Sequence, residues 1–219
     1  MDIKVSANTV IVFDLDDTLY YEIDFLRSAY LEIAKTLDSE NSSELFAFMF
    51  SAYRNKMNVF KLLSDKYNIS MENLIHQYRS HVPSIKLSRN LKEIFFQIKS
   101  CNGKIGVITD GRSTTQRSKI KALNIEHIVD VIVISEEIES EKPNLINFKI
   151  VEDTFPNCNY YYIGDNLKKD FIAPNTLGWD TIGLVDRGLN IHNSPFEALN
   201  NINFPKNFIL SFSEINVTK

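Results

Sequence analysis

Short apolar runs recur along the chain, and each one ends in polar residues. The runs occupy residues 10–13, 105–108, 129–134, 160–163 and 180–185. A short apolar run that stops at charged or polar groups is typical of a strand buried on both faces of a parallel sheet. These segments therefore predict a parallel sheet with polar side chains gathered where its strands end.

Helical spacing separates the strands in the second half of the chain. The helical segments are residues 91–98, 113–123 and 144–151. The first repeats apolar residues at i, i+3, i+4 and i+7, the second starts with residues that favour an N-cap, and the third follows a proline. Alternation of strand and helix from 87 to 185 predicts right-handed βαβ units, and so an α/β fold with a Rossmann-like parallel-sheet core.

The stretch from about 24 to 82 interrupts this alternation. It contains no clear strand and is dense in Phe and Tyr. Amphipathic helical patterns cover residues 25–37, 45–53, 59–67 and 74–78. We interpret residues 21–83 as an all-helical domain inserted after the first strand, with most of its aromatic side chains in its own core. Residues 1–20 and 84–219 then form the α/β core, and the polar segment after 186 is left open as strand or helix.

Composition narrows the classes of function. Acidic residues outnumber basic ones and the formal net charge is −4, so a nucleic-acid polymer is not indicated as a partner. No apolar run is long enough for a membrane helix, and two cysteines without a CxxC spacing suit a cytoplasmic protein with reduced thiols. The seven glycines form neither a GxGxxG fingerprint nor a P-loop. If the protein binds phosphate, it does so without a glycine-rich cradle.

Carboxylates concentrate at the predicted strand ends. Asp14 and Asp16 follow the first strand, and Asp165 and Asp170 follow a later one. Ligands of open α/β sheets bind outside the carboxyl ends of the strands, and converging carboxylates there require a cation or a shared proton. Oxygen-only ligands favour Mg²⁺, so we expect four carboxylates to converge on a magnesium site.

A cation beside a carboxylate nucleophile describes aspartyl-phosphate chemistry. A second carboxylate can protonate the leaving oxygen and then activate water. Lys142 would offset phosphate charge, and Thr109 can donate a hydroxyl hydrogen bond. We also expect the helix that starts near Ser113 to direct its free N–H groups at the phosphate.

These residues, taken in order, resemble the haloacid dehalogenase superfamily of phosphohydrolases. The segment Asp14-Leu15-Asp16-Asp17-Thr18 matches its D-x-D-x-T motif, and Gly164-Asp165 with Asp170 matches G-D-x-x-x-x-D. Thr109 and Lys142 match its second and third motifs, so the resemblance spans residues 10–185. The insertion is similar to the helical cap of the phosphoglycolate phosphatase-like branch.

The resemblance implies a role for each matching residue. Asp14 is implied as the nucleophile and Asp16 as the general acid/base. Phosphate binding falls to Thr109 and Lys142, together with Asp110 and Gly111 beside Thr109. Mg²⁺ would be held by Asp14, the backbone carbonyl of Asp16 and Asp165, with Asp170 near it.

The expected activity is Mg²⁺-dependent hydrolysis of a small phosphorylated metabolite, namely a sugar phosphate, phosphoglycolate or a nucleotide. A phosphomutase or phosphotransferase, a dehalogenase, a receiver-like phospho-accepting module and an inactive binding protein on the same fold remain alternatives. A monomer and a homodimer are both compatible with the sequence. Asp110 departs from the Asn that often follows the motif's Thr, and Arg112 is a candidate to offset its charge.

Overall fold

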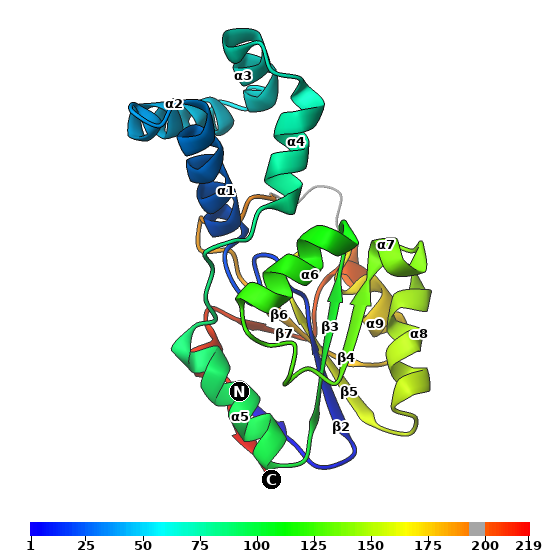
Figure 1. Ribbon diagram of the computed structural model, residues 1–219. Coiled ribbons are helices and arrows are strands. Elements are labelled where there is room, and N and C mark those ends of the chain that lie inside the picture. The colour runs from blue at the N-terminus through cyan, green and yellow to red at the C-terminus, as the bar shows by residue number, and fades with distance from the viewer. Residues whose placement is uncertain (193–199) are drawn as a thin grey trace.

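A central sheet of six parallel strands organises the computed structural model, which describes residues 1–192 and 200–219. The strand order is β4-β3-β2-β5-β6-β7. The bounds are β2 Thr9–Phe13, β3 Lys104–Thr109, β4 Val131–Ile134, β5 Asn159–Gly164, β6 Asp180–Leu184 and β7 Asn207–Ile209. All five predicted strands are present. Because β2 lies between β3 and β5, the segments that follow these three strands meet at one edge of the sheet (Figure 1).

Helices cover both faces of the sheet, as alternating side chains of a doubly buried strand require. On one face, Ile11 and Phe13 of β2 pack with α5 (Arg89–Ser100) and α6 (Ser113–Ala122). On the other face, Val10 and Val12 pack with α8 (Leu145–Thr154) and α9 (Ile172–Thr176). The short helix α7 (Ser135–Ile138) directly follows β4. The predicted α/β fold with a parallel sheet is therefore confirmed.

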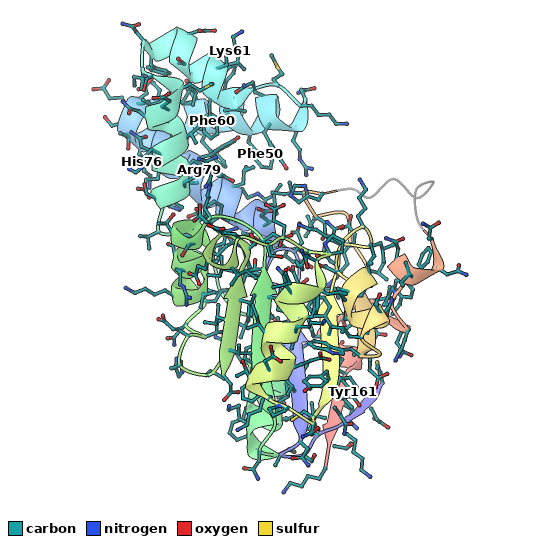
Figure 2. All side chains as sticks on the ribbon, turned by 90° about the vertical axis from the view of Figure 1, so that its right-hand side faces the viewer. Phe50, Phe60, Lys61, His76, Arg79 and Tyr161 are labelled. Carbon is teal, nitrogen blue, oxygen red and sulfur yellow. The ribbon has the colours of Figure 1, made fainter. Side chains whose placement is uncertain are left out.

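Four helices lie between β2 and α5 and form a lobe beyond the carboxyl ends of the strands (Figure 1). They are α1 Glu22–Leu37, α2 Ser42–Arg54, α3 Val59–Tyr67 and α4 Met71–Ser80. The lobe has an apolar core of its own, in which the Tyr30 ring contacts the rings of Phe60 and Tyr78. Phe60 lies inside the lobe, whereas Arg79 lies at its end beside the core (Figure 2).

The tail adds short elements that its sequence leaves open. The edge strand β7 comes from it, and β8 (Asn216–Thr218) pairs in parallel with β1 (Asp2–Lys4) in a second, two-stranded sheet. Two single-turn 3₁₀ helices flank β7: Asn201–Asn203 precedes it, and Phe212–Glu214 lies between it and β8. Residues 193–199 of this tail lie outside the described residues. No helix within 1–192 or 200–219 is long and apolar enough to cross a membrane.

Candidate active site

Asp14 occupies the first position after the central strand β2. Its backbone N–H donates to the carbonyl of Ile163 on β5, which fixes the residue at the edge of the sheet. Its Oδ1 accepts from Nζ of Lys142 at 2.5 Å, and the same ammonium donates to Oδ1 of Asp170 at 2.7 Å and to the hydroxyl of Tyr162 at 3.1 Å. The buried ammonium group of Lys142 thus links the residue that follows β2 to the segment that follows β5.

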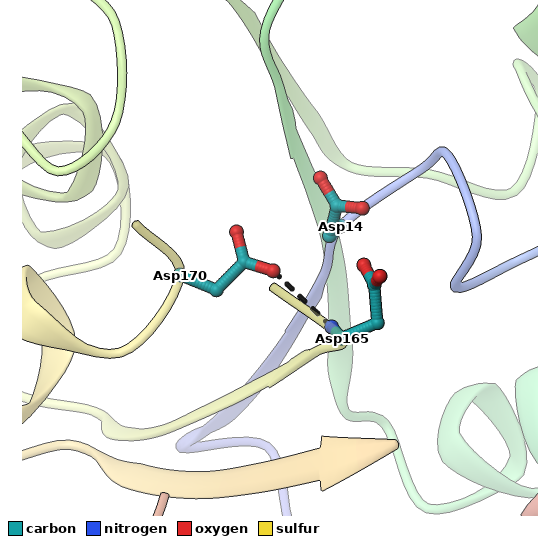
Figure 3. Close-up of side chains that lie close together, drawn as sticks. All are labelled: Asp14, Asp165 and Asp170. Carbon is teal, nitrogen blue, oxygen red and sulfur yellow. Dashed lines mark hydrogen bonds between the residues drawn. The ribbon is translucent and has the colours of Figure 1, made fainter. Parts of the chain in front are cut away.

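Three carboxylates gather beside this lysine. Asp14, Asp165 and Asp170 each offer one oxygen within 4.8 Å of the others (Figure 3). Asp170 is held by the backbone N–H groups of Asp165 and Asn166, which donate to its Oδ2 at 3.1 and 2.8 Å. The hydroxyl of Thr18 lies 3.3 Å from an Asp14 oxygen and 3.4 Å from an Asp165 oxygen. Several oxygen ligands on a fixed frame suit a hard divalent cation.

The electrostatics of the cluster also fit a cation. Burial raises the pKa of Asp14 to about 7, despite the opposing charge of Lys142. Burial, and then the negative charge of Asp170, raise the pKa of Asp165 to about 9. Both shifts mean that the charged forms of these buried carboxyl groups are poorly solvated and are only partly balanced by Lys142. A divalent cation among these three carboxylates would supply the missing charge.

Asp16 turns away from the cluster, so the expectation that four carboxylates converge is wrong for its side chain. Both of its oxygens accept from Nζ of Lys119, at 2.7 and 2.9 Å, and Nε2 of Gln116 donates to Oδ2 at 2.8 Å. The hydroxyl of Tyr20 donates to Oδ1. Burial alone would raise the pKa of Asp16, but the charge and hydrogen bonds of Lys119, with the other two donors, hold it below its usual value. The backbone bends at Leu15 and turns at residues 17–19, so the side-chain alternation of an extended strand does not continue from Asp14 to Asp16.

Thr109 is the last residue of β3, and Asp110 follows it, on the other side of β2 from β5. The Thr109 hydroxyl oxygen accepts from Nε2 of Gln116 at 2.6 Å, which leaves its hydrogen for an acceptor in the cavity. The Asp110 carboxylate accepts from the backbone N–H of Lys142 at 3.0 Å and from Nζ of Lys169 at 2.8 Å. Asp110 therefore holds two lysines at the site, and Lys169 is a second cation there.

Two glycines shape the backbone next to these groups. Gly111 has φ of +132°, a conformation that side chains rarely adopt, and its N–H donates to Oγ of Ser135 at 2.9 Å. At Gly164 the reason is space, because a Cβ atom would lie 2.5 Å from Oδ2 of Asp170. The glycines thus allow a bend and a close approach.

The start of α6 differs from the sequence prediction. The N–H of Ser113 donates to Oε2 of Glu136 at 2.7 Å, so a carboxylate of the protein itself occupies the end that was expected to face phosphate. Arg112 also pairs with Glu136, at 2.5 Å, and not with Asp110. Both expectations are wrong for the same reason: α7 follows β4 directly and places its acidic first turn against α6.

A small cavity of about 90 Å³ opens over the strand ends. Its walls include Asp14, Asp16, Thr109, Asp110, Lys169, Asp165, Asp170, Asp17, Glu22, Asn166 and His192. Burial raises the pKa of Glu22 to about 8, with a further rise from the charge of Asp16. The structure thus places six of the predicted site residues on one cavity, with Lys142 buried beneath it.

Comparison with known proteins assigns the family. The sequence pattern of the haloacid dehalogenase-like hydrolases matches residues 11–184. The chain belongs to this family. It is 27% identical over 197 residues to a glyceraldehyde 3-phosphate phosphatase from Methanocaldococcus jannaschii, covering 80% of this chain and 84% of that protein. It is 24% identical over 198 residues to the pyrimidine 5'-nucleotidase YjjG of Escherichia coli strain K12, covering 83% and 86%.

A solved structure supports the same fold. The HAD-hydrolase YfnB from Bacillus subtilis, bound to magnesium, superposes with a TM-score of 0.64 at 17% identity, covering 97% of both chains. The solved structure supports the α/β fold, and the family match together with the phosphatase relatives shows that the chain is an enzyme.

Several groups around the site of this hydrolase are not predicted from its sequence. Asn190 donates to Oδ2 of Asp165 at 2.8 Å, and His192 lies 3.6 Å from a Glu22 oxygen. Both belong to the segment after β6, where the pattern is too irregular to place a residue. Gln116 and Lys119 had a usable signal, because they stand three residues apart and face the same side of α6.

Proposed function

We propose that this hydrolase is a Mg²⁺-dependent phosphatase that cleaves a small phosphomonoester through an aspartyl-phosphate on Asp14. The proposal rests on one arrangement. Asp14, Asp165 and Asp170 each offer one carboxylate oxygen within 4.8 Å of the others. The ammonium group of Lys142 contacts both Asp14 and Asp170. A nucleophilic carboxylate, a cation site and a fixed positive charge are the requirements of this chemistry.

In the first step, a carboxylate oxygen of Asp14 attacks phosphorus and the bond from phosphorus to the ester oxygen breaks. The negative charge of the bound phosphate raises the pKa of Asp16 against the effect of Lys119. Asp16, once protonated, gives its proton to the ester oxygen, so the alcohol leaves neutral. Lys142 offsets the charge that Asp14 and the transferring group share. Thr109 donates its hydroxyl hydrogen to a phosphoryl oxygen, because Gln116 already occupies its oxygen as acceptor.

In the second step, water attacks the phosphorus of the aspartyl-phosphate. Asp16, now a carboxylate, takes a proton from this water, and the bond between phosphorus and Asp14 breaks. Asp14 returns as a carboxylate, Asp16 returns protonated, and inorganic phosphate is released. No other reactant is consumed, so the cycle closes.

Mg²⁺ would be held by the carboxylates of Asp14 and Asp165 and by the backbone carbonyl of Asp16. When bound, it neutralises phosphate charge and aligns the phosphoryl group with the nucleophile. Asp170 lies within reach of the same position, but it also accepts two backbone N–H bonds and a bond from Lys142.

The substrate is a small phosphomonoester: a sugar phosphate, phosphoglycolate or a nucleotide. The names of the curated relatives, a triose phosphate phosphatase and a nucleotidase, support this class. Residues 21–83 would be the cap domain that closes over it and excludes water.

The test is a panel of phosphate esters that includes p-nitrophenyl phosphate, assayed with Mg²⁺ and with a chelator. The wild type should release phosphate only with the cation, and Asp14→Asn should be inactive. Equal rates in wild type and Asp14→Asn would contradict Asp14 as nucleophile. Absence of turnover of every ester by the wild type would contradict the phosphatase itself.

A further inference from the structure

The buried face of α6 is polar. Thr115, Gln116 and Lys119 are all buried there, next to the apolar Ile120. Lys119 is only 3% exposed, and lysine is almost never buried unless it is paired with another group. A buried ion pair contributes little stability relative to well-packed apolar residues of similar volume. Stability therefore does not explain why the helix turns a lysine inward at this place.

The position of Lys119 explains it better. Its Nζ contacts both oxygens of Asp16, at 2.7 and 2.9 Å, and lies 3.8 Å from a Glu22 oxygen. It also lies 4.7 Å from the centre of the Phe25 ring. The Asp16 side chain is 20% exposed, whereas that of Lys119 is 4% exposed. Asp16 lines the cavity, whereas Lys119 is not among the described residues that line it.

Gln116 extends the arrangement to the phosphate side. Its Nε2 donates both to Oδ2 of Asp16 and to the hydroxyl of Thr109, at 2.8 and 2.6 Å. Gln116 thus connects Asp16, which would move the proton, to Thr109, which would bind phosphate. Side chains fixed in this way can hold two reacting groups at a constant separation.

We propose that Lys119 is the positioning residue for Asp16, a role that rests on the phosphatase chemistry proposed above. Lys119 holds the carboxyl group where it meets the leaving oxygen. When the proton moves from Asp16 to that oxygen, the negative charge left on Asp16 forms beside an ammonium already in place. No solvent needs to rearrange at that moment, which is the condition for effective electrostatic stabilisation.

The leaving group provides a direct test. An alkyl phosphate needs a proton on its departing alkoxide, whereas p-nitrophenolate departs without one. The value of kcat/KM reports the steps up to formation of the aspartyl-phosphate, so the two esters separate proton delivery from phosphoryl transfer. The alkyl ester used here is the one in the panel of phosphate esters that the wild type hydrolyses with the highest kcat/KM.

We expect Lys119→Met to lower kcat/KM for the alkyl ester by roughly 10- to 100-fold, and for p-nitrophenyl phosphate by less than about 3-fold. Lys119→Arg can contact both oxygens of Asp16 and should recover most of the loss. Asp16→Asn should show the same difference between the two esters. The matched control is Lys121→Met, which removes an exposed lysine two residues further along α6 and should match the wild type.

Binding of Mg²⁺ provides a readout apart from activity. The rise in melting temperature caused by Mg²⁺ should be the same in Lys119→Met and in the wild type, because Lys119 contacts the side chain of Asp16 and not the clustered carboxylates of Asp14, Asp165 and Asp170. An unchanged alkyl-ester rate, or an equal loss on both esters while Asp16→Asn separates them, would overturn the role of Lys119 and leave the phosphatase intact. Failure of the wild type on every ester would instead overturn the proposed function.

Discussion

The ammonium group of Lys142 lies 2.5 Å from Oδ1 of Asp14, and the two side chains are only 1% and 8% exposed. Loss of one partner from a buried ion pair leaves an uncompensated charge, which costs about 3–5 kcal/mol. Lys142→Met should therefore lower the free energy of unfolding by about 3 kcal/mol in the presence of a chelator. Denaturant unfolding measures this value.

The same substitution should lower phosphate release by at least about 10²-fold, because a fixed positive charge at the reacting group is lost. Lys168→Met, on the exposed side of the same loop region as Asp170, is the matched control and should leave both quantities unchanged. A Lys142→Met protein that keeps wild-type turnover would refute a role for this lysine in the reaction.

The raised pKa of Asp165 predicts how pH and Mg²⁺ act together. In the folded protein, burial and the charge of Asp170 raise this pKa to about 9, while in the unfolded chain it is about 4. Between these values the folded state binds the proton more tightly, so the free energy of unfolding falls as pH rises. A divalent cation replaces the proton and removes this penalty. The Mg²⁺-induced rise in melting temperature should thus be larger at about pH 8.5 than at about pH 6.

Differential scanning fluorimetry with Mg²⁺ and with a chelator measures both curves. In Asp165→Asn the carboxylate is absent, so the rise with Mg²⁺ should shrink and lose most of its pH dependence. A Mg²⁺ effect of the same size at both pH values would show that protons and the cation do not compete for this site.

Gly164 and Asp170 approach each other too closely for any other residue at 164. A Cβ atom would lie 2.5 Å from Oδ2 of Asp170, which two backbone N–H groups and Lys142 hold in place. Gly164→Ala should cost about 1–3 kcal/mol of stability and displace the Asp170 carboxylate. We expect a smaller Mg²⁺-induced rise in melting temperature and slower turnover.

Gly178→Ala separates the two effects. Gly178 has φ of +82°, so alanine is strained there, but nothing lies within 4 Å of its Cβ position. This variant should lose stability while keeping wild-type turnover and Mg²⁺ response. If Gly164→Ala behaved in the same way, the close approach to Asp170 would matter for folding alone.

The sequence predicts the fold wherever one physical signal dominates. The run at residues 10–13 becomes the central strand β2, all of it buried, because an apolar segment without a polar face must lie between two layers. The short elements lack such a signal. Strands β7 and β8 have three residues each and mixed exposure, and Pro174 lies inside α9. Long-range pairing forms these elements, and a local pattern does not report it.

The residues of the site likewise fall into those that a strong local signal predicts and those that lack such a signal. Asp14 and Asp165 were located because each directly follows a strand, and the sheet brings strand ends together. The partners of Asp16 were missed because a polar residue in a helix is normally assigned to its exposed face. In α6 that rule fails at Gln116 and Lys119, which are buried against a carboxylate about 100 positions earlier in the chain.

Two hydroxyl groups of α6 connect the helical lobe to the core. Thr115 donates to the backbone oxygen of Arg79 at 2.9 Å, and Ser118 donates to that of His81 at 3.1 Å. Both acceptors lie at the end of α4, where the chain leaves the lobe. Each bond contributes about 0.5–1.5 kcal/mol, so the double variant Thr115→Val, Ser118→Ala should loosen this junction without unfolding the sheet.

Amide hydrogen exchange measures this loosening. In the double variant, exchange should become faster over residues 79–88 and stay unchanged in β2 and β5. Thr114→Val changes the exposed neighbour on the same helix and should leave exchange as in the wild type. Unchanged exchange over 79–88 in the double variant would mean that apolar packing, and not these two bonds, fixes the lobe to the core.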